Sequence, residues 1–233
     1  CLCIRNTLIL KLLSESLLLL KGMKTELIFP TPVWKFDNVG IDRESLTEFV
    51  YYVKGEDPVG RQQTNHGGWQ SHDFIDRVID DNPLKEIRDA IMERAYAAAD
   101  QFGFNDFTLK MINMWINING KGAYNHVHTH PGGVLSGVYY LKLPDCCHGH
   151  LSFIRDFGYT QMKEFWGDGD NVHRWDHMNE TEHDVFPEVD QLVIFPAWLA
   201  HSVSTNAGDG DRISISFNIT AFSKHYHEIY PSR

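Results

Sequence analysis

The hydrophobic period of the chain changes near residue 107, and this change most constrains the fold. Before it, apolar residues recur at helical spacing in 41–55 and 83–103. After it, apolar and polar residues alternate in short runs separated by Gly, Pro, Asn and Asp. The predicted strands are 107–118, 134–143, 150–155, 190–196 and 212–220. Helices followed by many short strands predict a mainly β fold with flanking helices, namely a jelly roll or double-stranded β-helix.

Three other segments have weaker patterns. Residues 24–36 resemble an extended entry strand interrupted by prolines, and residues 57–72 form a polar, Gly-rich loop. Residues 156–189 make a long connection rich in acidic residues and tryptophan. A connection of this length is either a lid over a functional site or a solvated insertion, and the pattern favours neither.

The composition indicates one globular domain. The chain has 233 residues, of which 42% are hydrophobic, which is enough for a single sizeable core. Because the first methionine is Met23, we expect the domain to span 23–233 and residues 1–22 to be an upstream or non-native extension. A genuine amphipathic N-terminal helix is the alternative for this Leu-rich segment. The longest apolar stretches are interrupted by charge, so no membrane-spanning helix is predicted.

Charge and cysteine usage narrow the partners and the compartment. The formal net charge is −10, which disfavours tight binding to phosphate backbones and makes nucleic acid an unexpected partner. The four cysteines form no spaced zinc motif, and the adjacent Cys146 and Cys147 are too close for an ordinary disulfide. These features favour a reducing, cytoplasmic environment.

One segment carries most of the predicted chemistry. In the run Tyr124–Pro131, histidines alternate at His126, His128 and His130, so on a strand they share one face. Two imidazoles two residues apart can bind one metal ion, and a third ligand from a distant strand completes a facial set that leaves positions open. An isolated pair of this kind is a weak signal, because most are surface histidines.

A second segment makes the pattern more specific. An apolar run leads through Phe195 and Pro196 to His201, and Arg212 opens the strand that follows. An arginine at the mouth of a barrel is suited to gripping a carboxylate with two hydrogen bonds. Ser214 shares the face of Arg212. The ordered set therefore predicts a metal site next to a carboxylate site.

These motifs resemble those of the 2-oxoglutarate/Fe(II)-dependent dioxygenases. The stretches NHVHTHPGGVLSGVYYLKLP and VIFPAWLAHSVSTN…DRISISFN look like an oxygenase family found in marine bacteria and phages, within a superfamily similar to the prolyl hydroxylases. The opening MKTELIFPTPVWKF is similar to the start of that family. The resemblance covers the C-terminal half well and the N-terminal half loosely, and it implies Fe(II) and 2-oxoglutarate as cofactors.

The resemblance also implies roles for individual residues. His128, His130 and His201 stand at the three metal-ligand positions, and no catalytic side chain is expected beyond them. Residues that match cosubstrate-binding positions are Arg212, Tyr140, Asn117, Asn119 and Ser214. The spacing from Asn117 favours His128 and His130 as the pair, with His126 and His128 as the alternative.

One departure from the family pattern affects function. The superfamily has Asp or Glu where this chain has His130, and three neutral imidazoles leave a bound metal more positive. That set is typical of cupin-type dioxygenases. The alternatives to an oxoglutarate-dependent hydroxylase are thus a cupin-like three-histidine metalloenzyme and a non-catalytic jelly-roll binding module. The expected partners are molecular oxygen and an unidentified small-molecule or peptide substrate, and a homodimer is left open.

Overall fold

The structure is a computed structural model that describes residues 23–74, 82–103, 107–155 and 174–223. The chain divides into two compact units, residues 1–31 and residues 32–233. Of the first unit, only 23–31 are described, and they contain no helix or strand. The predicted extension 1–22 lies outside the described residues, so its origin stays a prediction.

Both predicted helices are present. Helix α2 (Arg43–Glu56) begins after Asp42, whose carboxylate accepts a hydrogen bond of 3.1 Å from the Ser45 N–H and so caps the helix. Helix α3 (Leu84–Gln101) begins after a proline and ends just before Gly103, which has φ of +70°. A left-handed residue after the last turn is the usual way for a helix to stop.

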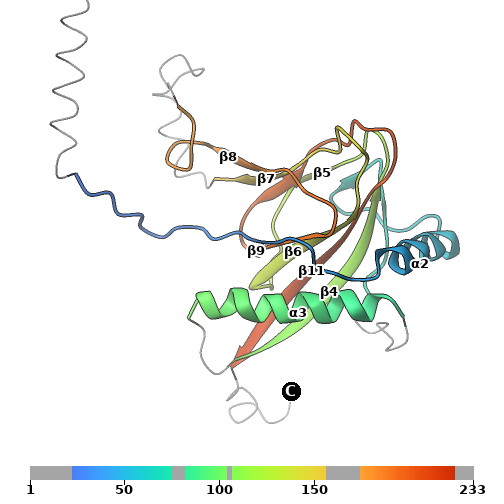
Figure 1. Ribbon diagram of the computed structural model, residues 1–233, viewed down its shortest axis with the longest axis horizontal. Helices are drawn as coiled ribbons and strands as arrows, with labels where there is room; N and C mark the ends of the chain where they lie inside the picture. The colour runs from blue at the N-terminus through green and yellow to red at the C-terminus, as the bar shows by residue number, and fades with distance from the viewer. Residues whose placement is uncertain (1–22, 75–81, 104–106, 156–173, 224–233) are drawn as a thin grey trace, which may run out of the picture. The chain divides into compact units, whose positions relative to one another are not determined.

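The strands form two antiparallel sheets, and all five predicted strands are confirmed. The larger sheet has the order β1–β9–β6–β11–β4–β3, and the smaller has the order β2–β5–β10–β7–β8 (Figure 1). The larger sheet contains β1 (Trp34–Phe36), β3 (Trp69–Gln70), β4 (Phe107–Asn119), β6 (Leu135–Lys142), β9 (Gln191–Pro196) and β11 (Arg212–Ser223). The smaller sheet contains β2 (Asn65–His66), β5 (Tyr124–His128), β7 (Leu151–Ile154), β8 (Glu182–Val185) and β10 (His201–Val203).

Three sequence-based expectations need correction. The entry strand predicted over 24–36 is limited to β1, because Pro30 and Pro32 lack the N–H that a sheet ladder needs. The segment 57–72 is not wholly a loop, since it contains β2 and β3. Within the long connection 156–189, β8 pairs with β7, so this part is an edge strand; residues 156–173 lie outside the described residues.

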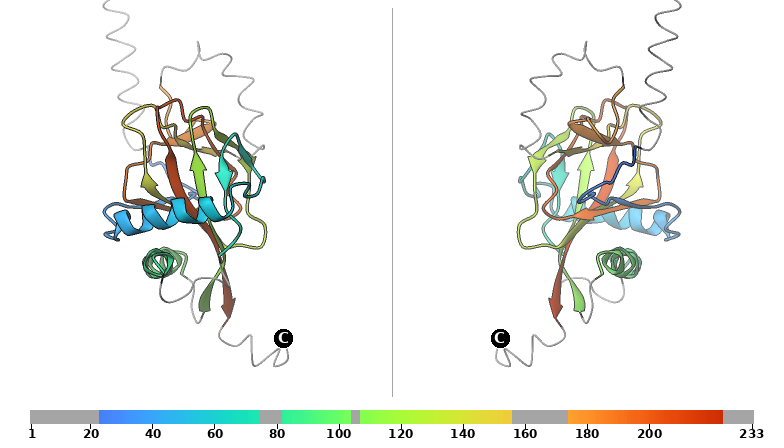
Figure 2. Two further views of the ribbon diagram at one scale, coloured as in Figure 1. Left: turned by 90° about the vertical axis from the view of Figure 1, so that its right-hand side faces the viewer. Right: turned by 90° about the vertical axis from the view of Figure 1, so that its left-hand side faces the viewer.

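The two faces of the larger sheet have different surroundings. Along β11, Ile213, Ile215 and Phe217 belong to the main apolar core, which also contains the buried faces of α2 and α3. The helices therefore cover the outer face of this sheet (Figures 1 and 2). The alternate residues Arg212, Ser214 and Ser216 point the other way and line the cavity between the sheets.

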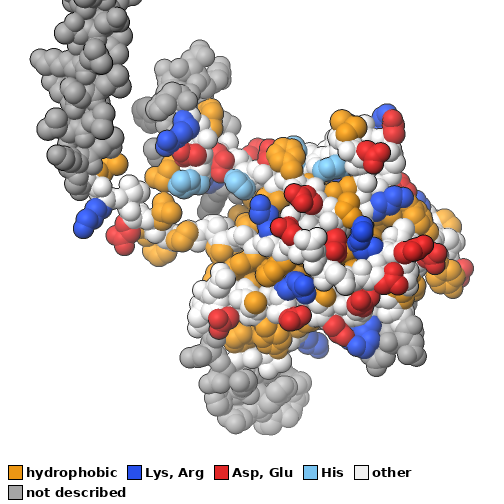
Figure 3. Space-filling view, in the orientation of Figure 1, with side chains coloured by type: hydrophobic (Ala, Val, Ile, Leu, Met, Phe, Trp, Pro, Cys, Tyr) orange, Lys and Arg blue, Asp and Glu red, His pale blue; other side chains and the backbone are white. Residues whose placement is uncertain are grey.

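The face shown in Figure 3 has a mixed surface. Acidic, basic and hydrophobic side chains are interspersed on it. Neither helix in the described part of the chain is long and apolar enough to cross a membrane.

Candidate metal centre

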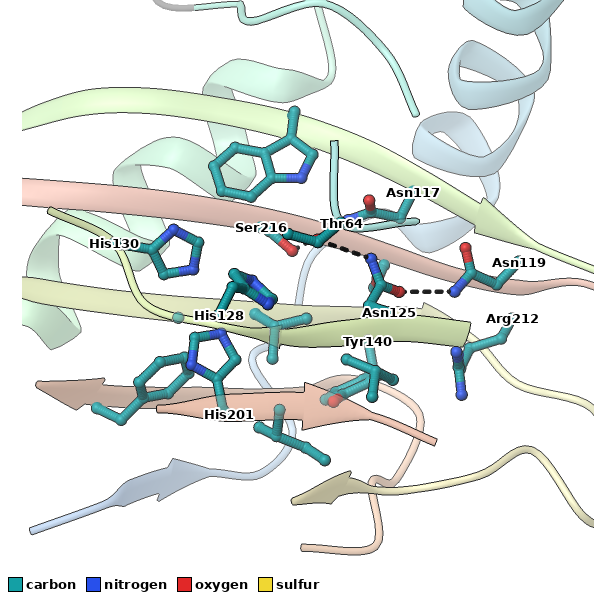
Figure 4. A pocket seen from close by; sticks show the side chains of 17 residues that line it. Thr64, Asn117, Asn119, Asn125, His128, His130, Tyr140, His201, Arg212 and Ser216 are labelled. Carbon is teal, nitrogen blue, oxygen red and sulfur yellow. Dashed lines mark hydrogen bonds between the residues drawn. The ribbon is translucent and has the colours of Figure 1, made fainter. Parts of the chain in front are cut away.

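Three histidines from two segments of the smaller sheet converge between the sheets. His128 ends β5 and is paired directly with His201 on β10. His130 lies two residues beyond β5, where its backbone N–H donates to the Ala197 carbonyl oxygen at 3.0 Å. One nitrogen from each of the three rings lies within 4.8 Å of the other two. The rings face one another in Figure 4.

Backbone carbonyls orient two of these rings. His128 Nδ1 lies 2.7 Å from the His126 carbonyl oxygen, and His201 Nδ1 lies 2.8 Å from the Leu199 carbonyl oxygen. Because a carbonyl oxygen only accepts, each Nδ1 carries the proton and each Nε2 keeps its lone pair. This arrangement, in which the second ring nitrogen donates to a backbone oxygen, is typical of histidines that bind metal.

Burial keeps all three rings neutral. It lowers the pKa of His201 to about 3 and of His130 to about 4, and it also lowers the pKa of His128; proximity to His128 adds to the effect on the other two. The Phe195 ring lies 4.7 Å from the His201 ring, centroid to centroid, and contributes to that burial. Neutral imidazoles near neutral pH are the form that binds a cation.

The structure also separates the two possible histidine pairs. His126 is exposed, and its ring lies beside those of Tyr124 and His66 at centroid distances of 5.0 and 6.2 Å. It therefore does not join His128 and His130. Although the strand alternation allows all three to share a face, β5 ends at His128 and His130 reaches the cluster from the loop.

A buried arginine lies at the other end of the same cavity. Arg212 is 2% exposed, and its Nη1 donates to the carbonyl oxygens of His148 and Ser204 at 2.6 and 3.0 Å. Its Nη2 is also buried but has no hydrogen-bond partner. Burial lowers the pKa of Arg212 from its usual value, but an arginine starting that high remains charged. A buried guanidinium with one unused donor is suited to an anionic ligand.

The other predicted cosubstrate residues surround Arg212. Ser214 is paired with Tyr140 on one side and with Asn117 on the other, and Arg212 is paired with Asn119. All five side chains line one cavity of about 530 Å³, part of which is open to solvent (Figure 4). Burial raises the pKa of the Tyr140 hydroxyl well above its usual value, so this group stays a hydrogen-bond donor. The sequence motif thus brings together the residues that it singled out.

Four polar or aromatic residues of the cavity were missed by the sequence analysis. The Trp115 ring lies 5.8 Å from that of His130, and Ser216 accepts a hydrogen bond of 3.0 Å from Asn117. Both follow from strand alternation, since they lie two residues from Asn117 and Ser214. Thr64 and Asn125 also line the cavity and are hydrogen-bonded to each other at 3.4 Å. Nothing in the sequence of the polar segment 57–72 identifies Thr64 as a cavity residue.

The donor set fits a divalent metal with a carboxylate beside it. Imidazole nitrogens suit iron, zinc, copper and nickel, whereas a free guanidinium donor and a phenol suit a carboxylate. Among the described residues, the histidine triad is the one group of three or more His, Cys, Asp or Glu side chains suited to hold a metal, and it contains no carboxylate. The metal charge is thus not neutralised by its three protein ligands.

The chain matches one protein-family model. Residues 113–218 match the model described as "Putative 2OG-Fe(II) oxygenase". The match begins in β4 and ends in β11, so it contains every predicted ligand of the metal and of the cosubstrate. No curated protein matches the chain significantly.

Solved structures show what the fold is similar to. A prolyl 4-hydroxylase from Pseudomonas putida is 18% identical, with 81% of this chain and 92% of that chain covered and a TM-score of 0.52. A prolyl hydroxylase from Trichoplax adhaerens, in complex with a peptide fragment of hypoxia inducible factor, is 14% identical, with coverages of 86% and 87% and a TM-score of 0.58. HygX from Streptomyces hygroscopicus, with nickel and 2-oxoglutarate bound, is 14% identical, with coverages of 82% and 83% and a TM-score of 0.54. The predicted double-stranded β-helix is therefore confirmed.

Proposed function

We propose that residues 113–218, which match the model of the 2OG-Fe(II) oxygenases, form a domain of that kind, and that His128, His130 and His201 hold the iron of a 2-oxoglutarate-dependent dioxygenase. A single observation carries the residue assignment. Three imidazoles with free ring nitrogens share a cavity with a buried arginine nitrogen that has no partner. A metal ion and a carboxylate meet these two needs together.

The chemistry of the bound group is that of the family. When bound, iron and 2-oxoglutarate would supply the oxidising power, with oxygen and 2-oxoglutarate converted to succinate, carbon dioxide and one oxygen atom inserted into a C–H bond of the substrate. The chain supplies the geometry. The carbonyl oxygens of His126 and Leu199 hold His128 and His201 in the tautomer whose Nε2 faces the cavity.

The far end of the cavity binds the distal carboxylate of the cosubstrate. Arg212 offers its unpartnered Nη2, and the Tyr140 hydroxyl lines the cavity beside it. The carbonyl oxygens of His148 and Ser204 hold the guanidinium in place, so little conformational freedom is lost on binding. Hydrogen bonds to charged groups contribute about 1.5–3 kcal/mol, enough to select a dicarboxylate over a monocarboxylate.

Apolar side chains form part of the cavity wall. The lining includes Val138, Leu151, Phe195 and Val203. An apolar wall lowers the local dielectric constant, which strengthens the attraction between a cosubstrate carboxylate and Arg212.

The charge of the ligand set explains how a chain without a carboxylate ligand can still use this cosubstrate. Three neutral imidazoles leave a divalent ion with its full double charge. A dianion such as 2-oxoglutarate then compensates charge that Asp or Glu supplies elsewhere in the superfamily. We expect a stronger dependence of metal retention on the cosubstrate than in a protein whose third ligand is acidic.

Cosubstrate turnover tests the proposal. The protein, incubated in air with Fe(II) and 2-oxoglutarate, should release succinate, and His201→Ala should release none above the protein-free control. Iron binding without succinate release and without 2-oxoglutarate binding would instead favour a three-histidine metalloenzyme that does not use this cosubstrate. The absence of iron binding as well would favour a non-catalytic binding module.

We also propose that the substrate is a small molecule or a peptide and that the chain can assemble as a homodimer. Two free, exposed thiols, Cys146 and Cys147, support a reducing compartment such as the cytoplasm, because exposed thiols oxidise readily elsewhere.

A further inference from the structure

Two adjacent thiols lie in the turn after β6, outside the metal centre. Cys146 and Cys147 are both exposed and form no disulfide. The two residues are neighbours in the sequence, so both thiols extend from one short stretch of backbone, and interaction with Cys147 raises the pKa of the Cys146 thiol. Two neighbouring accessible thiols are a bidentate ligand for soft, thiophilic centres.

The backbone of this turn is held in an unusual conformation. Cys147 has φ of +59°, a left-handed conformation that costs a residue with a side chain about 1–2 kcal/mol. Its carbonyl oxygen accepts the N–H groups of Ala207 and Gly208 at 2.8 and 3.1 Å. The turn that contains Cys146 and Cys147 is therefore hydrogen-bonded to the loop that precedes Arg212.

The same turn also positions Arg212 directly. The His148 carbonyl oxygen, next to Cys147, accepts the 2.6 Å hydrogen bond from Arg212 Nη1. At Gly149, which has φ of +79°, an added Cβ atom would lie 2.7 Å from that nitrogen. The Ser204 hydroxyl accepts the His150 N–H at 2.7 Å, and the Ser204 carbonyl oxygen accepts Arg212 Nη1. A change in the backbone at Cys147 must therefore reach the guanidinium.

We propose that Cys146 and Cys147 form a dithiol site for a thiophilic ligand that takes both sulfur atoms, and that its occupation weakens anion binding at Arg212. Chelation brings both side chains to one atom and changes the backbone at Cys147. The His148 carbonyl oxygen then shifts and the Arg212 side chain loses its shortest hydrogen bond. The effect on 2-oxoglutarate rests on the proposed function, whereas capture by the thiols does not.

Phenylarsine oxide is the probe, because trivalent arsenic prefers two thiols. Two As–S bonds form, the arsenic–oxygen double bond and two S–H bonds break, and the oxygen leaves as water with both thiol protons. The arsenic stays trivalent, so no oxidant or reductant is needed. The full chain carries Cys1→Ser and Cys3→Ser, which leave Cys146 and Cys147 as its thiols.

Two measurements test the proposal on this protein. Intact mass should show one phenylarsenic group per chain, lost with Cys146→Ser and with Cys147→Ser. Calorimetry should show at least fivefold weaker 2-oxoglutarate binding in the adduct, and saturating 2-oxoglutarate should weaken arsenical binding by the same factor.

Each opposite result has a distinct meaning. A chain that takes up no arsenical, or takes it up equally in the single Ser variants, overturns the dithiol site. An adduct with unchanged 2-oxoglutarate affinity overturns the link to Arg212. If the untreated protein binds no 2-oxoglutarate, the proposed function fails while the mass measurement still decides the thiol site.

Discussion

His128 and His201 are paired directly across antiparallel strands β5 and β10, and each donates its Nδ1 proton to a nearby carbonyl oxygen. Their ring centroids lie 4.3 Å apart. The pairing fixes the distance between the two rings and the carbonyl oxygens fix which nitrogen is free. Both features come from the strand pairing and the backbone, so the sheet itself orients the two rings.

Removal of one ring should abolish tight metal binding. We expect His201→Ala to lower Fe(II) affinity at least 100-fold, because the two remaining imidazoles cannot form a facial set. His126→Ala is the matched control, since this exposed histidine lies on the same strand as His128 but outside the cluster. Calorimetric titration with metal measures both variants. A large loss in His126→Ala with little loss in His201→Ala would contradict the assignment.

Two substitutions of His130 distinguish the effect of the ligand's charge from its ability to bind the metal. His130→Ala should lower metal affinity, whereas His130→Asp should restore the acidic ligand usual in the superfamily and retain the metal. Because the aspartate cancels one positive charge of the metal, we expect 2-oxoglutarate affinity to fall about tenfold in His130→Asp relative to the unaltered protein. Equal affinity in these two proteins would show that ligand charge does not control cosubstrate binding.

Acid should destabilise the metal-free protein through these histidines. Burial holds the pKa of folded His201 at about 3, below the unfolded value of about 6.5, so the unfolded chain binds more protons between those values. Stability is therefore fully present above pH 6.5 and is lost as the pH falls toward 3, by roughly 4 kcal/mol for this residue. Denaturant unfolding at several pH values should give a shallower pH dependence for His201→Gln. Identical slopes in the two proteins would contradict the buried, neutral state.

Gly149 should be required for the position of Arg212. Gly149→Ala places a Cβ atom 2.7 Å from Arg212 Nη1 and 2.8 Å from the Ser204 carbonyl oxygen. Gly122→Ala is the matched control, because Gly122 has a similar φ of +87° but open space around the added atom. Both variants should lose about 1–2 kcal/mol from the backbone conformation. Only Gly149→Ala should also lose 2-oxoglutarate affinity, by about tenfold; an equal loss in both would refute the positioning role.

Much of the fold and site could be predicted because their signals are local. Alternation in β4 and β11 identifies one polar and one apolar face, and the polar face carries Asn117 and Arg212. The same alternation would place His126 on one face with His128 and His130. In the structure β5 ends at His128, the loop after it brings the His130 ring into the cluster, and His126 is exposed. An end of a strand depends on its neighbours and has no reliable signal in sequence.

What could not be predicted depends on contacts between distant segments. β8 (Glu182–Val185) contains two acidic residues, Glu182 and Asp184, which have little strand preference, and it forms by pairing with β7. Thr64 reaches the cavity because β2 pairs with β5. The hydrogen bond from Arg212 to the His148 carbonyl oxygen involves a backbone atom, which no residue type reveals.

Anaerobic titration of the Fe(II) protein with 2-oxoglutarate tests the central claim most directly. Chelation of iron by the cosubstrate should produce a visible charge-transfer band. Its midpoint should rise roughly 10–100-fold in Arg212→Lys, because the fixed second donor is lost, and about fivefold in Tyr140→Phe. Lys121→Ala, which removes an exposed cation from the Asp209 ion pair, should leave the midpoint unchanged. A band with the same midpoint in the unaltered protein and both site variants, or no band with iron bound, would contradict a cavity built for iron and 2-oxoglutarate.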